Sequence, residues 1–305
     1  MKRLNVRVTH GLVLFGAFLG LLPSVGAQVD CDRHHPGVLQ RAIDRARPGD
    51  TILVAGTCRE NVTIPEGKDR ITLDGGGKAI IYGPDATQDT LSVRGRGITI
   101  KGFTITGGQD GIGVGQGGTA LIDGNTIEST GGRGIDVFRV SFAVLVNNTV
   151  QNNPEIGVAV TTNSFAFIGV RTSEDTVASP NTIQNNGFAG INVSFSSSTR
   201  IVGNTSRNNG ISGIRVDRAS HADISDNTID GNGRHGIHVS SGSGVNLGAD
   251  TGDGIFQRPN RTKNNNTDFG IRCEIGGNAN GRLGSLNGDR GAENYSEGCV
   301  NSLIR

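Results

Sequence analysis

The chain contains no tryptophan and two tyrosines, and aromatic residues make up 4% of its 305 residues. Flat ring platforms, on which neutral sugars or unpaired bases stack, are therefore hard to build. The chain also lacks an excess of charge of either sign, since 29 basic residues stand against 28 acidic ones. Nucleic-acid-binding domains usually carry a strong positive balance, so the composition argues against nucleic acid as a partner.

Long apolar runs are missing as well. The apolar run near the N-terminus extends from Gly11 to Leu22, which is shorter than the roughly 20 residues that a membrane-spanning helix needs. Basic residues precede this run, and Val25 and Ala27 stand at the small-residue positions before Gln28. The pattern predicts a cleavable signal peptide over residues 1–27 and a secreted, periplasmic or extracellular protein that is not membrane-embedded. An uncleaved membrane anchor is the alternative.

The chain has few cysteines, and all four lie after the predicted cleavage site. Cys31 and Cys58 are near the start of the mature chain, and Cys273 and Cys299 are near its end. An even number of cysteines in an exported chain indicates disulfides, and proximity favours pairing within each end. No two cysteines have the close spacing of metal ligands, so a metal-binding or catalytic cysteine is the weaker interpretation.

A short strand signature, glycine followed by an apolar, a variable and an apolar residue, recurs along the chain. The signature glycines are separated by 23, 23, 33, 23, 23 and 34 residues. The seven copies begin at Gly111, Gly134, Gly157, Gly190, Gly213, Gly236 and Gly270. Internal repetition at this period is typical of solenoids and separates the chain from disordered glycine-rich sequences.

Two columns of asparagines run in step with the signature. The first comprises Asn125, Asn148, Asn181, Asn204, Asn227 and Asn260, and the second comprises Asn153, Asn186, Asn209, Asn232 and Asn265. Asparagine tolerates the left-handed backbone conformation, and its amide can bond to an identical amide one coil away. The columns therefore predict stacked asparagine ladders at sharp turns.

The period of two inside each signature indicates short strands, two or three of which fit into 23 residues. A unit this small cannot bury its apolar face alone, so it must stack on its neighbours through right-handed connections. The sequence therefore predicts an all-β fold, a single-stranded right-handed parallel β-helix. A leucine-rich repeat has a similar period, but its leucine framework is missing.

Less regular rungs are expected upstream at Ile52–Val54, Ile71–Leu73 and Leu91–Val93, which gives about ten rungs with the seven copies. Before them, apolar residues between Val38 and Ala46 have helical spacing and stop at Pro48. We expect an amphipathic helix that covers the N-terminal end of the core. The expected organisation is a signal peptide (1–27), an N-terminal cap (28–50) and a β-helix with a C-terminal cap (51–305).

The entry into the first rung carries a family resemblance. The stretch Pro48–Val54, followed by Gly56–Val62, resembles the N-terminal entry of bacterial right-handed β-helix repeat proteins of the pectate-lyase-like superfamily, where a tyrosine commonly stands in place of Cys58. The resemblance covers nearly the whole mature chain and implies the fold. That fold hosts lyases, hydrolases, esterases, epimerases, binding modules and adhesins, so it does not by itself imply one function.

The variable position of each signature and the residue after it are expected to point outward, because side chains alternate along a strand. These positions carry Asp136 and Asn192 in the middle of the chain, and charged residues gather on the last three rungs. The charged set comprises Arg215, Asp217, His238, Arg272 and Glu274. Since adjacent rungs are about 5 Å apart, these side chains are predicted to form one polar patch.

Two insertions of ten residues interrupt the first asparagine column, before Asn181 and before Asn260. Both are expected to leave the same corner of the solenoid, three rungs apart. Insertions on one face commonly border a binding site. We therefore expect two loop walls about 14 Å apart, with the polar patch between or beside them.

Such a patch matches the chemistry of an acidic polysaccharide or cell-surface glycan. Removing the proton beside a uronate carboxylate needs a cation against the carboxylate and a tuned base. Arg215 and Arg272 are candidate cations, with His238, near Asp217, as the base. Asn192, Glu274 and Asp136 are candidate substrate-binding residues. Ordinary solvated ion pairs across the rungs are the competing interpretation.

No cofactor is expected from the sequence. His235 and His238, three residues apart, should face opposite sides of a strand, which disfavours a metal. Asp250 and Asp253 could wrap a calcium ion, although a polar loop explains them as well. The leading hypothesis is thus a protein that binds, and could cleave or epimerise, an acidic polysaccharide; a non-catalytic surface, structural or binding module is the alternative. A periplasmic accessory role in metal-enzyme maturation is more distant.

Overall fold

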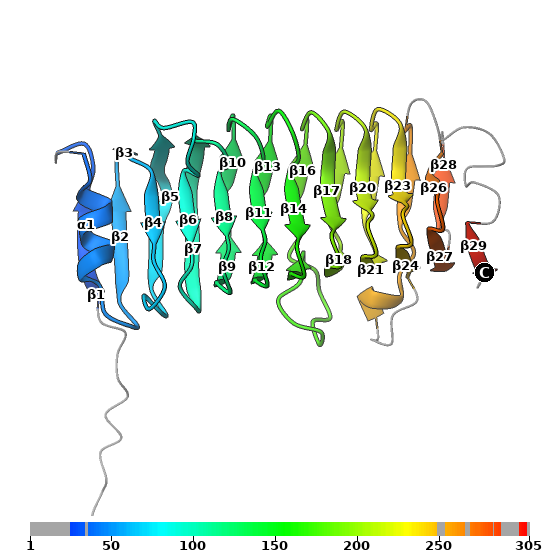
Figure 1. Ribbon diagram of the computed structural model, residues 1–305, viewed down its shortest axis with the longest axis horizontal. Helices are drawn as coiled ribbons and strands as arrows, with labels where there is room; N and C mark the ends of the chain where they lie inside the picture. Colours follow the sequence, from blue (N-terminus) through cyan, green and yellow to red (C-terminus); the bar gives the residue numbers. More distant parts are fainter. Residues whose placement is uncertain are drawn as a thin grey trace, which may run out of the picture.

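The computed structural model describes residues 25–33, 36–248, 254–265, 269–282, 284–287 and 299–303. Over these residues the chain winds into about ten coils that stack along one axis, as Figure 1 shows. All strand pairs in the described coils are parallel. The fold predicted from the 23-residue period, a parallel β-helix, is confirmed.

One side of each coil belongs to a nine-stranded sheet within the described residues, here called sheet B. Its strands are β4 (Val62–Ile64), β6 (Leu91–Val93), β8 (Ile112–Val114), β11 (Ile135–Val137), β14 (Val158–Thr161), β17 (Ala189–Ser194), β20 (Ser212–Val216), β23 (His235–Val239) and β26 (Ile271–Cys273). The strands that carry the repeated signature all lie in sheet B. Their register is the one that the repeat predicts, since Ile135 pairs with Ile112 on one side and Val158 on the other.

The two remaining sides of each coil form a second sheet, here called sheet A, with 20 strands among the described residues. One column comprises β1 (Val25–Asp30), β2 (Thr51–Ala55), β9 (Thr119–Asp123), β12 (Phe142–Val146), β15 (Phe165–Ile168), β18 (Ser198–Val202), β21 (His221–Ser225), β24 (Gly244–Leu247), β27 (Asn278–Gly281) and β29 (Val300–Leu303). The other comprises β3 (Thr57–Arg59), β10 (Thr126–Glu128), β13 (Thr149–Gln151), β16 (Thr182–Gln184), β19 (Thr205–Arg207), β22 (Thr228–Asp230), β25 (Arg261–Lys263) and β28 (Ser285–Asn287). The long strands β5 (Thr72–Gly83) and β7 (Ile98–Gly107) continue through both columns.

The core is a column of aliphatic side chains inside the coils. Ile135, Ile191, Ile214 and Ile237 all have 0% exposure. Full burial of one such side chain stabilises a protein by about 1.5–3 kcal/mol. Since each coil alone would leave its inner face open at both ends, this stabilisation is gained only when coils stack.

Both asparagine ladders are present. In the first, the backbone N–H and the side-chain amide of Asn181 both donate to Oδ1 of Asn204, at 3.0 and 2.8 Å. In the second, Asn209 makes the same two bonds to Asn232, both at 3.0 Å. The expected left-handed conformation, however, belongs to the residue before many ladder asparagines, such as Asn208 at φ 53°. That residue makes the turn, which lets the ladder asparagine face inward.

A serine ladder, which we did not predict, occupies the turn between sheet B and the first column of sheet A. Backbone N–H groups donate to serine hydroxyls one coil further on, at 3.1–3.2 Å. Its members are Ser141, Ser164, Ser197, Ser220 and Ser243. Each of the three turns of a coil therefore carries a polar ladder that satisfies buried backbone groups.

The predicted capping helix is α1 (Val38–Arg45), and it covers the N-terminal end of the stack (Figure 1). Its apolar side chains Leu39 and Ile43 have 0% exposure and belong to the main core. Disulfides join Cys31 to Cys58 and Cys273 to Cys299, as proximity predicted. No helix among the described residues is long and apolar enough to cross a membrane.

The upstream rungs differ from the expectation. Of the expected rungs, Ile52–Val54 and the last two residues of Ile71–Leu73 belong to sheet A, whereas Leu91–Val93 lies in sheet B. The rung of sheet B that the sequence missed is β4 (Val62–Ile64). The predicted cleavage point after Ala27 falls within β1, and most of the predicted signal peptide lies outside the described residues. The cleavage therefore stays a prediction.

Candidate functional site

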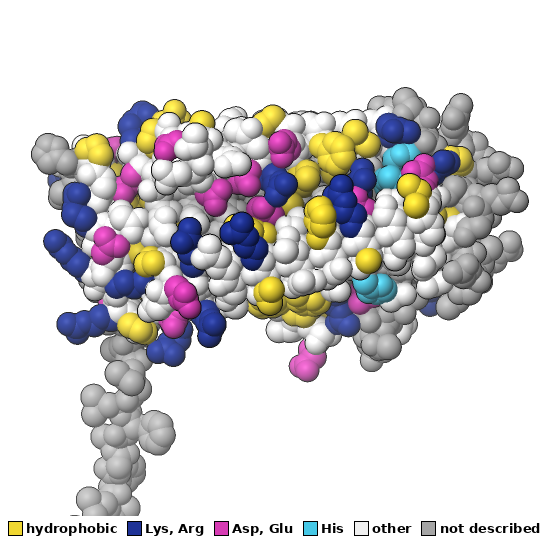
Figure 2. Space-filling view, in the orientation of Figure 1, with side chains coloured by type: hydrophobic (Ala, Val, Ile, Leu, Met, Phe, Trp, Pro, Cys, Tyr) yellow, Lys and Arg dark blue, Asp and Glu magenta, His cyan; other side chains and the backbone are white. Residues whose placement is uncertain are grey.

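The outer face of sheet B carries the polar residues that the sequence singled out. The variable positions of successive signatures pair with one another and form one row, in the predicted register. From β11 to β26 the row reads Asp136, Ala159, Asn192, Arg215, His238 and Arg272. Figure 2 shows acidic and basic side chains mixed along the molecule, with a histidine beside a basic and an acidic side chain near one end. The face thus presents charges of both signs, with an acidic residue at the N-terminal end of this row and basic residues at its C-terminal end.

The C-terminal patch is assembled as predicted and consists of Arg215, Asp217, His238, Arg272 and Glu274. Arg215 contacts Oδ2 of Asp217 through Nε at 2.9 Å and through Nη2 at 2.8 Å. Arg272 donates from Nε to Oε1 of Glu274 at 2.8 Å, and Nε2 of His238 lies 3.3 Å from Oε2 of the same carboxylate. Each arginine therefore has a carboxylate partner two residues away on its own rung.

The patch is less exposed than expected. The side chain of His238 is 9% exposed and that of Asp217 is 3% exposed. Neighbouring rungs stand only about 4.8 Å apart, so long side chains cover the shorter ones beneath them. The expectation that the side chain of His238 projects into solvent is therefore wrong. The same expectation for Arg215 holds only in part, since its side chain is 24% exposed.

The environment of His238 favours the neutral form of its imidazole. Burial lowers the pKa of His238, and the positive charge of Arg215 lowers it further. Glu274, the hydrogen-bond partner, opposes these effects. Nδ1 of His238 is buried and has no hydrogen-bond partner in the described part of the chain. A neutral imidazole next to a carboxylate is the form that can accept a proton.

His235 does not lie on the opposite face from His238. The centroids of the two rings are 4.8 Å apart. The pairing between β20 and β23 matches Ser212 with His235 and Ile214 with Ile237 but skips the glycines between them. The regular alternation of side chains therefore breaks at Gly236, and the prediction from spacing alone was wrong.

A small pocket, which we call the central pocket, lies over β14, β17 and β20 and has a volume of about 150 Å³. Its floor is polar and comprises Thr161, Asn192, Ser194, Arg215 and Asp217. Phe188 and Phe195, which immediately flank β17, also line it. Arg215 and Arg218 stack over these two rings, at 5.4 and 4.4 Å from the ring centroids. The scarce aromatic residues thus do form a local platform, contrary to the expectation from composition.

A larger groove, which we call the N-terminal groove, lies over β6, β8 and β11 and has a volume of about 720 Å³. Its charged lining comprises Asp89, Arg94, Asp110, Arg133, Asp136, Arg139 and Glu155. Nη1 of Arg133 contacts Oδ2 of Asp136 at 2.6 Å, and its backbone N–H donates to Oδ1 of Asp110 at 2.7 Å. Asp136 therefore belongs to this groove rather than to the C-terminal patch.

Two carboxyl groups in the N-terminal groove have strongly shifted pKa values. Burial raises the pKa of Asp89 to about 6, with the charges of Asp110 and Asp136 adding to the effect. Burial also raises the pKa of Asp136 to about 6, although Arg133 opposes it. Oδ1 of Asp136 is buried without a hydrogen-bond partner among the described residues. The groove can therefore take up or release protons near neutral pH.

The sequence missed this groove because Asp89 and Asp110 stand in turns, outside the strand signature. One signal was present. Gly113 occupies an outward position of the signature, and the carboxylate of Asp89 lies where a β-carbon at Gly113 would stand. A missing side chain in an otherwise polar row leaves space that a neighbouring turn can fill.

The two insertions leave the same corner, as predicted, but they do not border sheet B. They connect β15 to β16 and β24 to β25, which are both pairs of sheet A strands. Val170 and Ala178 of the first insertion pack with Ile255 and Phe256 of the second. Phe256 also lies beneath Arg200 of β18, with 5.3 Å between the guanidinium and the ring centroid. The described parts of both insertions thus cover sheet A, on the far side of the coil from the patch.

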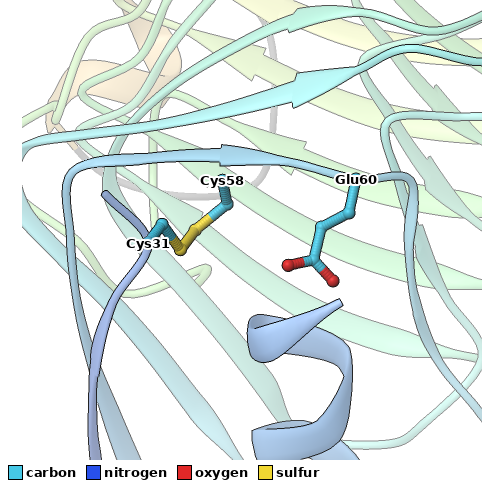
Figure 3. Close-up of side chains that lie close together, drawn as sticks. All are labelled: Cys31, Cys58 and Glu60. Atoms are coloured by element: carbon cyan, nitrogen blue, oxygen red, sulfur yellow. A yellow bond between two sulfur atoms is a disulfide. The ribbon is translucent and has the colours of Figure 1, made fainter. Parts of the chain in front are cut away.

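The described residues offer one group of metal-ligand side chains, comprising Cys31, Cys58 and Glu60 (Figure 3). The two cysteines are joined in a disulfide, so their sulfur atoms are not available as thiolates. The carboxylate of Glu60 accepts hydrogen bonds from the backbone N–H groups of Leu39 and Gln40, both at 3.0 Å. Glu60 therefore caps helix α1, and the two cysteines crosslink the chain beside it. Asp250 and Asp253, the candidate calcium ligands, lie outside the described residues.

The three-sided parallel coils and their polar outer sheet define the chain as a parallel β-helix protein. A family model described as a right-handed β-helix region matches it over residues 50–180, 90–251 and 159–280. The chain therefore belongs to this family of right-handed β-helix proteins. The family match and the similar structures below confirm the right-handed β-helix fold that the resemblance implied. No curated protein matches the chain.

Solved structures share the fold at low sequence identity. An alginate lyase from Paenibacillus sp. strain FPU-7 is 18% identical, with a TM-score of 0.58 over 90% of this chain and 99% of that one. The pectate lyase Pel9A is 13% identical, with a TM-score of 0.57 over 92% and 81% of the two chains. The A-module of the mannuronan C-5 epimerase AlgE6 from Azotobacter vinelandii is 17% identical, with a TM-score of 0.50 over 82% and 83%. At these identities the likeness shows the fold alone.

Proposed function

We propose that the protein binds an acidic polysaccharide along the outer face of sheet B. One observation carries the proposal: the N-terminal groove, the central pocket and the C-terminal patch follow one another on the same row of strands. From β11 to β26 the row advances by five rungs, which is about 24 Å at 4.8 Å per rung. An extended chain of several sugar units fits such a row better than a compact ligand does.

The charges of the face suit a polymer that carries both carboxylates and hydroxyl groups. Exposed arginines such as Arg139 and Arg218 line the two cavities and can pair with uronate carboxylates. Buried carboxylates such as Asp136 and Asp217 can accept hydrogen bonds from sugar hydroxyls. The similar structures support this choice of ligand, because they are an alginate lyase, a pectate lyase and a mannuronan C-5 epimerase.

The proposal extends to proton abstraction at the C-terminal patch. His238 takes the proton from the carbon beside the uronate carboxylate, while Arg215 and Arg272 stabilise the negative charge that develops there. Glu274 orients the imidazole through its hydrogen bond. The bond from the adjacent carbon to the glycosidic oxygen then breaks, and the departing oxygen takes up the proton from the protonated His238, which gives an unsaturated end. When water instead protonates the carbon on its opposite face and His238 releases its proton to solvent, the product is the epimer.

A second candidate function, a non-catalytic binding module, rests on the enclosure of the patch. Nε2 of His238 is bonded to Glu274, and Nδ1 is buried. Arg215 and Arg272 are each held by a carboxylate of their own strand. In this function the patch is a rigid recognition surface, and no base reaches the sugar.

The test is to mix the purified protein with alginate and polygalacturonate at low salt, measuring binding by calorimetry and new unsaturated uronate ends by absorbance. NMR of the recovered polymer detects epimerisation. Arg215→Gln should weaken binding about tenfold or more, as expected for loss of a charge-assisted contact. The matched control is Arg207→Gln, an exposed arginine on sheet A, which should bind like wild type.

The variant His238→Ala separates the two functions. Loss of turnover with retained binding assigns the base to His238, whereas binding without any turnover in wild type assigns the module function. If neither polymer binds to wild type, the proposal is wrong, and the face of sheet B is a solvated ion-pair surface.

A further inference from the structure

The central pocket has a more specific arrangement than the rest of the face. At about 150 Å³ it has room for one sugar ring but not for an extended segment of polymer. Its floor comes from three successive rungs, and Phe188 and Phe195 come from the turns at the two ends of β17. Pockets that bind small polar ligands commonly combine apolar walls with a few placed polar groups.

The floor of the pocket contains an unsatisfied hydrogen-bond acceptor. Asp217 is 2% exposed, and both contacts from Arg215 reach the same oxygen, Oδ2. Oδ1 is buried and has no hydrogen-bond partner among the described residues. A buried carboxylate oxygen without a donor is costly, and a ligand hydroxyl group is a donor that would remove this cost.

The wall of the pocket combines an apolar surface with a positive charge. The ring of Phe195 is 51% exposed, and the guanidinium of Arg218 lies 4.4 Å from its centroid. The aromatic ring holds the arginine side chain in place. The side chain therefore loses less conformational entropy when it binds an anion. A ligand with an apolar ring face, a hydroxyl group and a carboxylate matches these three features together.

We propose that the central pocket holds one uronate unit of the bound polymer. The sugar ring packs against Phe195, a hydroxyl group donates to Oδ1 of Asp217, and the carboxylate pairs with Arg218. This inference rests on the proposed function, since it gives the polymer a fixed point on sheet B. It also makes Phe195 and Arg218 specificity-determining residues that the strand signature does not contain.

The probes are tetragalacturonate and its methyl ester, titrated into wild type and variants by calorimetry. Phe195→Ala should weaken binding of tetragalacturonate about fivefold or more, and Phe195→Tyr should restore it. Arg218→Gln should weaken binding of tetragalacturonate but leave binding of the methyl ester unchanged. The control Val140→Ala alters an exposed residue of the equivalent turn two rungs away and should have no effect.

The outcomes separate the two proposals. If wild type binds the uronate tetramer and Phe195→Ala or Arg218→Gln binds it equally well, the pocket is not the anchoring point, although binding along the face stands. If Arg218→Gln weakens both probes equally, the carboxylate contact is wrong. If wild type binds neither the tetramer nor the polymers, the proposed function fails and the pocket inference fails with it. Phe195 and Arg218 are both exposed, so unchanged thermal melting is expected for the variants.

Discussion

The second asparagine ladder allows a sharp test, because two neighbouring asparagines of one turn face opposite ways, one into the coil and one into solvent. Asn209 is 1% exposed, and its Nδ2 lies near Ser206 Oγ at 3.2 Å and Asn232 Oδ1 at 3.0 Å. Asn208 is exposed in the left-handed conformation. The isosteric change of asparagine to aspartate replaces the amide nitrogen with an oxygen in both places. Only at Asn209 does that oxygen meet buried acceptors.

The expected magnitude follows from the proton that the buried aspartate must keep. An unfolded aspartate has a pKa of about 3.9, which is about 3 units below pH 7. Keeping the buried carboxyl protonated at pH 7 therefore costs about 4 kcal/mol of folding free energy. Burial raises the pKa of the new carboxyl in the folded state above its value in the unfolded state. The variant is therefore most stable at low pH, where both states are protonated, and it loses stability as the pH rises. The destabilisation by Asn209→Asp should shrink by about 1.4 kcal/mol for each pH unit between 7 and 4.5.

The measurement is urea unfolding of wild type, Asn208→Asp and Asn209→Asp at pH 7 and pH 4.5, with stabilities compared at each pH. Asn208→Asp should stay within about 0.5 kcal/mol of wild type, because the site is exposed and aspartate tolerates a left-handed backbone. Equal losses at both positions would refute the ladder argument. A loss at Asn209 that does not decrease at pH 4.5 would refute the buried-proton argument.

Three further predictions concern the ends of the helix and the N-terminal groove. Glu60→Ala should cost about 1–3 kcal/mol in urea unfolding, because two backbone N–H groups at the start of α1 lose their acceptor. Removing the Cys31–Cys58 disulfide, whose cysteines are 27 residues apart, should cost about 3–4 kcal/mol by the loop-entropy relation; an unchanged melting temperature would show that this end is held by packing alone. Alginate binding measured from pH 7.5 to 5 should strengthen as the pH falls through about 6, because protonation of Asp89 and Asp136 removes negative charge from the groove. Asp136→Asn should flatten this pH dependence, and an unaltered profile would place the relevant proton elsewhere.

The sequence was most informative where one physical constraint repeats. A 23-residue period with alternating apolar positions can be satisfied only by stacking, so the coils, the register of sheet B and the ladder pairs followed from spacing. The same periodicity predicts that Arg215 lies beside His238, and β20 and β23 pair these two residues. It also placed Asp217 on the rung of Arg215 and Glu274 on the rung of Arg272.

Tertiary structure decided what lies around the repeated row. Turns vary in length and direction from coil to coil, and three features of the site depend on them. These are the enclosure of His238, the groove that brings Asp89 and Asp136 together, and the pocket that Phe188 and Phe195 line. The direction of the two insertions was likewise settled by an apolar cluster over sheet A, in which Val170 and Phe256 are joined by Val202 of β18. The sequence by itself determined the positions that repeat, because every coil must fit the one below it. It left open the shape of the cavities, because turns form their walls. The path of a turn depends on the residues that it packs against and not on its position in the 23-residue repeat.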